Sequence, residues 1–401
     1  MKKIDATISA PQGFCAAGVK ANIKKSGKHD VGLLYCETPA SVAGVFTQNK
    51  MAAAPVHISR AAAGRDYARA LIVNSGCANA CTGDQGMLDA RAMVQMTANA
   101  LDISTNEVLV CSTGVIGQLL PMGKVADGIR DVAKEIGKQD GSEFALAIMT
   151  TDTFMKKAAY EIEIDGHKVL LSGVAKGAGM IHPNMATMLC FITTDVNICP
   201  KVLKKMVSEI ANKSFNMIVV DGDTSTNDTM LVMASNLAGN CQIDSEQHPD
   251  YNNFYQALLA ISQDLAKLIV RDGEGATKFL EINVKGAKDF AQAKMAAMSI
   301  AKSPLVKTAF FGKDANWGRI ICAAGYSGAD LDPKNVTLHI EDLCIMKNGL
   351  DTEYNVQRLT AIMQNTDIKI TLDLAVGNEE ATVWTCDFSY DYVKINAEYH
   401  T

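Results

Sequence analysis

The sequence predicts an α+β fold, in which helices and strands follow each other without a regular alternation. Apolar residues recur every three to four positions, the spacing of one helix face, in residues 88–100, 125–136, 200–214, 253–270, 290–301 and 353–364. Alternating or β-branched stretches, which are typical of strands, cover residues 159–164, 188–194, 279–285, 336–341, 368–374, 381–385 and 390–395. These stretches lack the strand–helix–strand rhythm of a parallel sheet, and this favours α+β over a doubly wound fold.

The order of these elements also predicts how the chain divides. Pro200 stands at the expected start of a helix, where its missing N–H leaves no hydrogen bond unmade. From about residue 285 the chain contains a helix, strands, a second helix and further strands. We therefore expect residues 285–401 to form a smaller C-terminal α+β domain, and residues 187–284 to belong to the larger core before it.

Size and charge exclude several classes of protein. A chain of 401 residues has room for two to three domains at roughly 150 residues each. With 48% hydrophobic and 20% charged residues, it can bury a sizeable core. The net charge of −6 is spread along the chain without a basic stripe, so we expect no nucleic-acid or membrane-surface partner. We also expect a cytoplasmic protein, because no export signal or membrane-length apolar run is visible.

Familiar cofactor and metal motifs are absent. The sequence has no Gly-x-Ser-x-Gly, His-Glu-x-x-His or Gly-x-Gly-x-x-Gly pattern, and residues 117–124 depart from a phosphate-binding loop in spacing. Its seven histidines are dispersed. The acidic run at residues 221–228 lacks the later glutamate of a calcium-binding loop, since Val232 stands at that position. We therefore expect neither a metal nor an organic cofactor.

Residues 176–195 contain the densest group of chemically useful residues. A glycine-rich polar loop runs into the apolar stretch 188–192, and Thr187 stands at the junction. A threonine hydroxyl becomes a nucleophile when a base lies beside it, and the residue's own α-amine is such a base once the chain is cut. The residues alone leave two interpretations open. Thr187 is either a β-branched residue that enters a core strand, or a nucleophile released by self-cleavage after Ala186.

A series of ordered motifs resembles a known family. Residues 179–189 are similar to the self-cleavage site of the glutamate N-acetyltransferase family, also called ornithine acetyltransferases, which are self-cleaving bifunctional enzymes of arginine biosynthesis. The likeness continues through residues 74–76, 111–117, 150–153, 221–228, 271–278, 316–319 and 396–401. The resemblance implies an N-terminal-threonine-nucleophile fold with mixed sheets. It also implies an α fragment (1–186) and a β fragment (187–401), which pair into an α2β2 heterotetramer.

The resemblance assigns roles to individual residues. Thr187 matches the threonine that cleaves the chain after Ala186 and then carries the acetyl group. Thr113 and Gly114 match the pair that stabilises the oxyanion. Substrate-binding positions of the family, besides Thr187 itself, match Thr153, Lys176, Glu274, Asn396 and Thr401. Lys176 suits a substrate carboxylate and Glu274 suits an ammonium group.

The implied reaction is acetyl transfer from N2-acetyl-L-ornithine to L-glutamate through an acetyl ester on Thr187. Some family members also accept acetyl-CoA, which makes it a candidate co-substrate here. One alternative is an N-terminal-nucleophile amidase or aminopeptidase, in which water resolves the acyl-enzyme. A second alternative is a metabolite-binding protein without catalysis.

Overall fold

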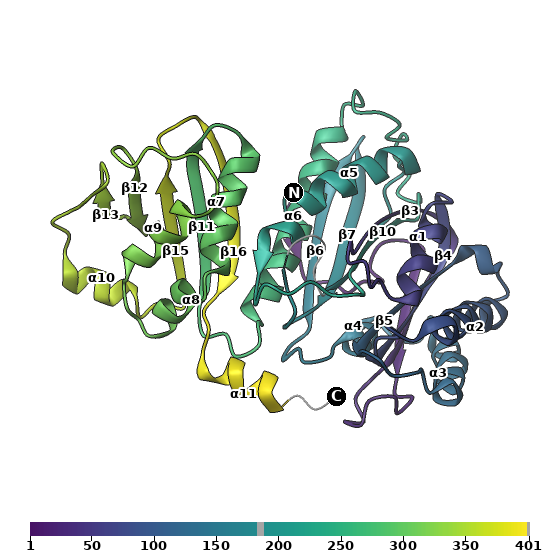
Figure 1. The fold of residues 1–401 in the computed structure, drawn as a ribbon. Coiled ribbons are helices and arrows are strands. Elements are labelled where there is room, and N and C mark those ends of the chain that lie inside the picture. The colour runs from purple at the N-terminus through teal and green to yellow at the C-terminus, as the bar shows by residue number, and fades with distance from the viewer. Residues whose placement is uncertain (183–187, 399–401) are drawn as a thin grey trace.

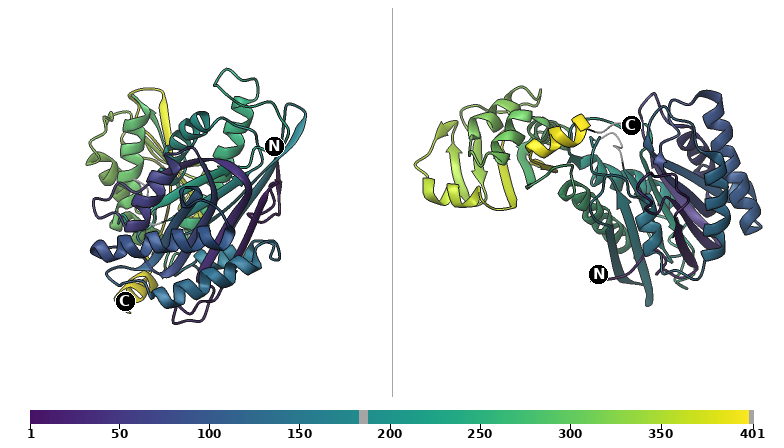
Figure 2. Two further views of the ribbon diagram at one scale, coloured as in Figure 1. Left: turned by 90° about the vertical axis from the view of Figure 1, so that its right-hand side faces the viewer. Right: turned by 90° about the horizontal axis from the view of Figure 1, so that it is seen from below.

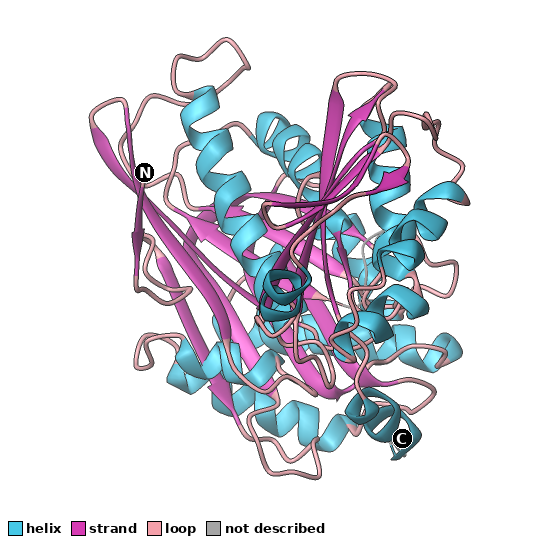
Figure 3. Ribbon diagram, turned by 90° about the vertical axis from the view of Figure 1, so that its left-hand side faces the viewer, coloured by secondary structure: helices cyan, strands magenta, loops and turns pink. Residues whose placement is uncertain are grey.

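Two β-sheets, each flanked by helices, form the protein (Figure 1). The computed structural model describes residues 1–182 and 188–398. Figure 3 shows the strands of both sheets with helices packed between and beside them. Both sheets mix parallel and antiparallel neighbours, so the predicted α+β class with mixed sheets is confirmed.

Within the described residues, the first sheet has nine strands, in the order β1-β6-β7-β8-β10-β3-β4-β5, with β2 added along β3. Their bounds are β1 (Lys2–Ile4), β2 (Phe14–Val19), β3 (Val31–Phe46), β4 (Tyr67–Cys77), β5 (Val108–Val115), β6 (Lys156–Ile164), β7 (His167–Lys176), β8 (Leu189–Thr194) and β10 (Thr229–Ala234). Two pairs, β4 with β5 and β8 with β10, are parallel. Parallel strands begin and end at the same edges of a sheet, so loops distant in sequence meet there.

Helices cover both faces of this sheet. They are α1 (Ala54–Ala63), α2 (Gly83–Leu101), α3 (Met122–Glu135), α4 (Ser142–Ile148), α5 (Pro200–Asn212) and α6 (Tyr251–Arg271), with short 3₁₀ turns at Thr105–Glu107 and Phe215–Met217. Strand β8 illustrates how the sheet packs against helices on both sides, because its successive side chains point to opposite faces of the sheet. Phe191 packs edge-on against Phe144 of α4, with ring centroids 5.8 Å apart, whereas Ile192 belongs to the core that contains α5 and α6.

The second sheet has the order β14-β13-β12-β15-β11-β16-β9. Its elements are β9 (Ile218–Val219), β11 (Phe279–Ala287), β12 (Thr337–Ile340), β13 (Leu343–Lys347), β14 (Leu350–Asp351), β15 (Asp367–Asp373) and β16 (Glu379–Cys386), with helices α7 (Phe290–Lys302), α8 (Pro304–Phe311), α9 (Trp317–Gly325) and α10 (Val356–Ile362). The short strand β9, from before α6, pairs in parallel with β16. The core therefore continues across both sheets. The predicted boundary at residue 285 falls inside β11, and the division into domains stays a prediction.

Each predicted helix overlaps a helix of the structure, and each predicted strand but the last overlaps a strand. The strand predicted at residues 390–395 is wrong, because Tyr390–Glu398 form helix α11. Its apolar and polar residues alternate, but none of its residues is buried. Without a neighbouring strand or a buried face, alternation carries no information about the backbone. Instead, the Ser389 hydroxyl accepts a hydrogen bond from the Tyr392 amide and caps the first turn.

Helix α11 extends from the second sheet back towards the first (Figures 1 and 2). It therefore brings residues near the end of the chain to the loops that follow β7 and α6. Among the described helices, none is long and apolar enough to cross a membrane.

Candidate active site

Most of the predicted site residues meet in one cavity of about 340 Å³. Five of them line it, namely Thr113, Gly114, Lys176, Glu274 and Asn396. The other lining residues come from the end of β5 and from the loops before β6 and after β7: Val115, Ile116, Thr150, Thr151, Gly179 and Met180. Segments separated by more than 200 residues thus build one site. The predicted residues Ala186, Thr187 and Thr401 lie outside the described part of the chain.

The end of β5 requires a glycine at position 114. Its φ of +130° is a conformation that side chains disfavour, and an added Cβ would lie 2.4 Å from the carbonyl carbon of Gly76 in β4. The two strands are held together here by side chains as well, since the Ser112 hydroxyl donates to Asn74 Oδ1 at 2.6 Å. The backbone of Thr113 and Gly114 is therefore fixed in the cavity wall.

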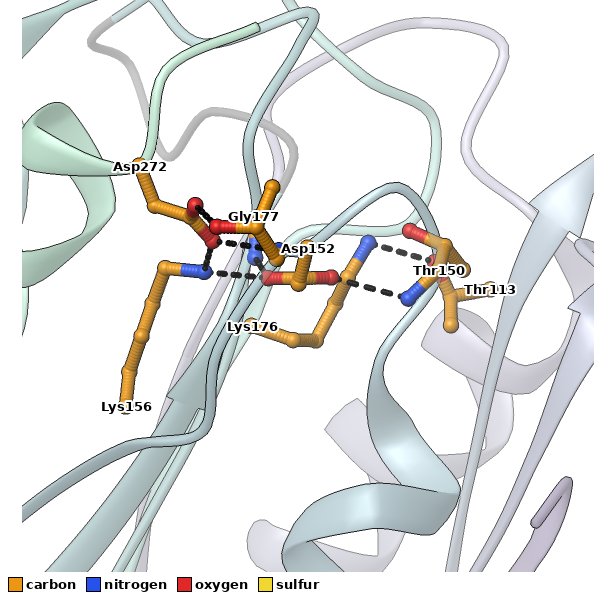
Figure 4. A network of polar contacts seen from close by, with 8 residues as sticks. Thr113, Thr150, Asp152, Lys156, Lys176, Gly177 and Asp272 are labelled. Atoms are coloured by element: carbon orange, nitrogen blue, oxygen red, sulfur yellow. Dashed lines mark hydrogen bonds and ion pairs between the residues drawn. The ribbon is translucent and has the colours of Figure 1, made fainter. Parts of the chain in front are cut away.

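Lys176 ends β7 and places a fully buried ammonium group in the cavity wall. Burial lowers the pKa of this ammonium, and the nearby Asp152 carboxylate opposes that shift. Its Nζ donates to Thr113 Oγ1 at 3.2 Å, the one hydrogen bond that it makes to a described residue (Figure 4). An ammonium has three N–H groups, so two stay available to a ligand. Because Thr113 Oγ1 accepts from Lys176, its own hydrogen is free to donate.

A buried ion network lies beside Lys176, on the side away from Thr113 (Figure 4). The ammonium of Lys156 pairs with both Asp152 and Asp272, and all three side chains are almost completely buried. Asp152 also accepts hydrogen bonds from the backbone amides of Gly177, at 2.7 Å, and Thr150, at 2.8 Å. Although burial alone raises the pKa of Asp152, the charges of Lys176 and Lys156 hold it at about 2. Two carboxylates and two ammonium groups therefore balance each other beneath the site.

Thr153 belongs to this network and does not line the 340 Å³ cavity of the candidate active site. Its hydroxyl and its backbone amide both donate to Asp272. It faces a neighbouring hollow that His29 and Asp152 also line. The structure therefore connects Thr153 to the site through Asp272, and its predicted contact with substrate stays a prediction.

Glu274 adds a negative charge to the cavity that Lys176 also lines. Its backbone amide donates to the Ala178 carbonyl at 2.8 Å, and Asn396 Nδ2 of α11 donates to its Oε2 at 3.0 Å. Gly179 leaves the space that this carboxylate occupies, because a Cβ there would lie 2.5 Å from Oε2. The glycine-rich loop therefore fits closely against Glu274.

Sequence reasoning missed the role of two acidic residues in the run 221–228. Asp221 accepts hydrogen bonds from the Met180 and Ile181 amides, the latter at 2.9 Å. Asp228 accepts one from the Met188 amide at 2.9 Å. The run thus holds the chain on both sides of residues 183–187. Two aspartates seven residues apart in a hydroxyl-rich segment were the only signal available from the sequence.

Asp228 is an unusual anchor, because only one of its carboxylate oxygens is used. The side chain is fully buried, and Oδ2 has no hydrogen-bond partner among the described residues. Burial raises the pKa of Asp228 well above its usual range, despite the opposing effects of the Met188 amide and of Lys176. The interior thus favours a protonated Asp228.

Metal ligation has no support in the described residues, which contain no group of three or more histidine, cysteine, aspartate or glutamate side chains arranged to hold an ion.

Comparison with known proteins gives one consistent result. A family model described as the ArgJ family matches residues 15–401. The arginine biosynthesis bifunctional protein ArgJ of Geobacillus kaustophilus is 49% identical over 398 residues, which cover 99% of this chain and 97% of that protein. The protein of the same name from Listeria monocytogenes is 49% identical over 402 residues, with all of both chains covered.

One solved structure supports these matches. The crystal structure of the arginine biosynthesis bifunctional protein from Bacillus halodurans is 48% identical, with a TM-score of 0.52, and the match covers 53% of this chain and 100% of that one. A structure of ornithine acetyltransferase from Mycobacterium tuberculosis, complexed with ornithine, is 41% identical, with a TM-score of 0.42, and covers 46% of this chain.

We predict that Asp228→Asn flattens the dependence of stability on pH. An unfolded aspartate has a pKa of about 3.9, so above that pH the unfolded chain loses a proton that the folded protein retains. The free energy of unfolding of the wild type should therefore fall as pH rises above about 4, up to the raised pKa of Asp228. Asparagine keeps an oxygen for the Met188 amide but does not titrate.

Denaturant unfolding between about pH 5 and pH 8 measures this effect, because the other titrating groups are common to both proteins. The stability of the variant relative to wild type should increase with pH. Asp223→Asn, at an exposed position in the same run, is the matched control and should change the pH dependence much less, because the Asp223 charge makes only a minor contribution to the raised pKa of Asp221. Parallel pH curves for wild type and Asp228→Asn would contradict the interpretation.

Proposed function

The chain belongs to the ArgJ family, and from this premise we propose that it transfers an acetyl group from N2-acetyl-L-ornithine to L-glutamate in arginine biosynthesis. The observation that carries the proposal is the 340 Å³ cavity, in which Thr113 and Gly114 lie beside a buried ammonium, Lys176, and a carboxylate, Glu274. Acetyl-CoA is a second candidate donor, and an α2β2 assembly in the cytoplasm is part of the same proposal.

The charges of the cavity fit these substrates. Acetylornithine has an α-carboxylate and a side-chain ammonium, whereas glutamate shares only the α-carboxylate. Lys176, with two unused N–H groups, suits the carboxylate, and Glu274 suits the ammonium. Because Lys176 is buried and fixed by Thr113 at 3.2 Å, it can position a carboxylate without losing much side-chain freedom on binding.

The proposal includes self-cleavage before Thr187. The Thr187 hydroxyl attacks the Ala186 carbonyl carbon, and the bond from that carbon to the Thr187 nitrogen breaks, so that an ester and a free amine form. Water hydrolyses the ester and leaves a carboxylate on Ala186. Two findings support this step. Asp221 and Asp228 hold the chain on both sides of the bond, and the solved Bacillus halodurans chain matches 53% of this sequence, close to the share of residues 187–401.

Acetyl transfer then proceeds in two steps through Thr187. Its hydroxyl oxygen attacks the acetyl carbon of acetylornithine, while the freed α-amine accepts the hydroxyl proton and passes it to the departing ornithine nitrogen. The α-amine of glutamate next attacks the acetyl ester and restores the hydroxyl. In both steps we assign the stabilisation of the oxyanion to the Thr113 hydroxyl and the Gly114 amide, a contribution that in other enzymes is worth about 3 to 4 kcal/mol per donor.

We predict that Thr187→Ala leaves one uncut, inactive chain, because the substitution removes both the attacking oxygen and the acetyl acceptor. The wild type should give two fragments under denaturing conditions, and N-terminal sequencing of the larger should begin at Thr187. A wild type that stays uncut while fully active would contradict the self-cleavage step.

Thr113→Ala should lower turnover by roughly 10² to 10³ with little change in melting temperature.

We also predict that Glu274→Gln affects the two half-reactions unequally. The substitution keeps the size of the side chain but removes the charge that faces the ornithine ammonium, so acetylation by acetylornithine should slow more than deacetylation by glutamate. Single-turnover measurements of each step test this prediction.

Gly179→Ala should act in the same direction, because its Cβ would displace the Glu274 carboxylate. Gly123→Ala, where a Cβ meets no atom within 4 Å, is the matched control for this change. If Glu274→Gln has small and equal effects on both steps, Glu274 does not bind the ornithine ammonium and is only a solvated surface charge.

A further inference from the structure

A second cavity is lined by residues of α1, of α2 and of the start of β5. Figure 1 shows these elements on the side of the molecule away from the second sheet. Its volume is about 460 Å³, which is larger than that of the candidate active site. Small-molecule sites in proteins typically have volumes of about 300 to 1,000 Å³. The size alone therefore permits an organic ligand.

Two arginine side chains in this cavity have no partner in the part of the chain that the structure describes. The sequence contains eight arginines, and six of them direct the guanidinium group to a carboxylate, a carbonyl or a hydroxyl. The exceptions are Arg65 and Arg91, whose guanidinium groups have no hydrogen bond or ion pair to any described residue. Both line the same cavity, whereas two arginines that only face solvent would have no reason to lie together in one cavity.

Neighbouring carboxylates do not neutralise this charge. Among the described residues, no acidic side chain lines the cavity, whereas His57, Gln95 and Asn106 add further polar groups. Asp66, next to Arg65 in the sequence, is instead paired with Lys204 at 2.5 Å. Glu107, next to Asn106, accepts a hydrogen bond from the Ser104 amide at 3.0 Å. The cavity is therefore positively charged without internal compensation.

The walls of the cavity are formed before any ligand binds. The Ser59 hydroxyl of α1 is buried, donates to the Val110 carbonyl of β5 at 2.6 Å and accepts from the Val110 amide at 2.8 Å. On α2, Arg91 and Gln95 lie one helical turn apart on the face that Val94 helps to bury. A ligand would thus bind to ordered helices and would not have to fix their backbone.

This cavity differs from the candidate active site in position and in charge. Val108 lines it at the start of β5, whereas Thr113 lies five residues further along the strand, about 16 Å away at 3.3 Å per residue. The active-site cavity pairs one positive with one negative side chain, but this one has only positive and neutral groups. A cationic amino acid such as ornithine would be repelled here.

We propose that the cavity between α1 and α2 binds a small organic dianion, with one carboxylate or phosphate group at each of Arg65 and Arg91. Guanidinium groups match both kinds of anion, because their parallel N–H donors form bidentate hydrogen bonds. Ile58, Ala61 and Val94 supply an apolar floor for the carbon skeleton between the two acidic groups.

Calorimetric titration of the full-length protein tests this proposal, with pyrophosphate and citrate as separate probes in a chloride buffer of low ionic strength. We expect one site per chain for at least one probe, and the comparison of the two separates phosphate from carboxylate preference. Arg65→Gln and Arg91→Gln should each weaken binding by about tenfold or more. Both substitutions are at exposed positions and should leave the melting temperature unchanged.

Arg130→Gln is the matched control, since Arg130 is an exposed arginine of α3 that is already paired with Asp127. It should leave the affinity within about twofold of wild type. Saturating ornithine should also leave probe binding unchanged. The proposal is overturned if neither probe binds at millimolar concentration, if Arg130→Gln weakens binding as much as the other two substitutions, or if ornithine displaces the probe.

Discussion

The balance of four buried charges is the constraint on which the candidate active site depends. Lys156 pairs with Asp152 and Asp272, and Lys176 completes the set at the cavity wall. Loss of one partner from a buried pair leaves an uncompensated charge and costs about 3 to 5 kcal/mol. The loops before β6, after β7 and after α6 are therefore coupled, because each contributes at least one member or one amide to the network.

This coupling explains how an ammonium group can be buried in the cavity wall. Lys176 has no carboxylate partner of its own among the described residues. Burial lowers the pKa of its ammonium group, but the negative charge of Asp152 opposes this shift and so favours the charged form. Its hydrogen bond to Thr113 orients it towards the cavity, and Gly114 fixes the adjacent backbone through a close approach to Gly76. The site thus combines charge, position and an available hydroxyl in residues that lie far apart in sequence.

Sequence patterns predicted the parts of the fold with strong periodicity, such as the helix at residues 200–214, which is α5, and the strand at 188–194, which is β8. They failed at residues 390–395, where alternation occurs in an exposed helix. Resemblance to a family, and not local pattern, brought Lys176 and Glu274 together as site residues. The contact of Thr153 with Asp272 and the burial of Asp228 depend on packing between distant segments, which no local pattern of one sequence contains.

The central claim is that Thr187 carries the acetyl group, and intact-mass spectrometry of the denatured protein tests it most directly. The account predicts two fragments, divided between Ala186 and Thr187. After acetylornithine is added, the fragment that begins at Thr187 should gain one acetyl group, and glutamate should then remove it. A single uncut chain with full activity, or a mass that acetylornithine leaves unchanged while N-acetylglutamate accumulates, would contradict the account.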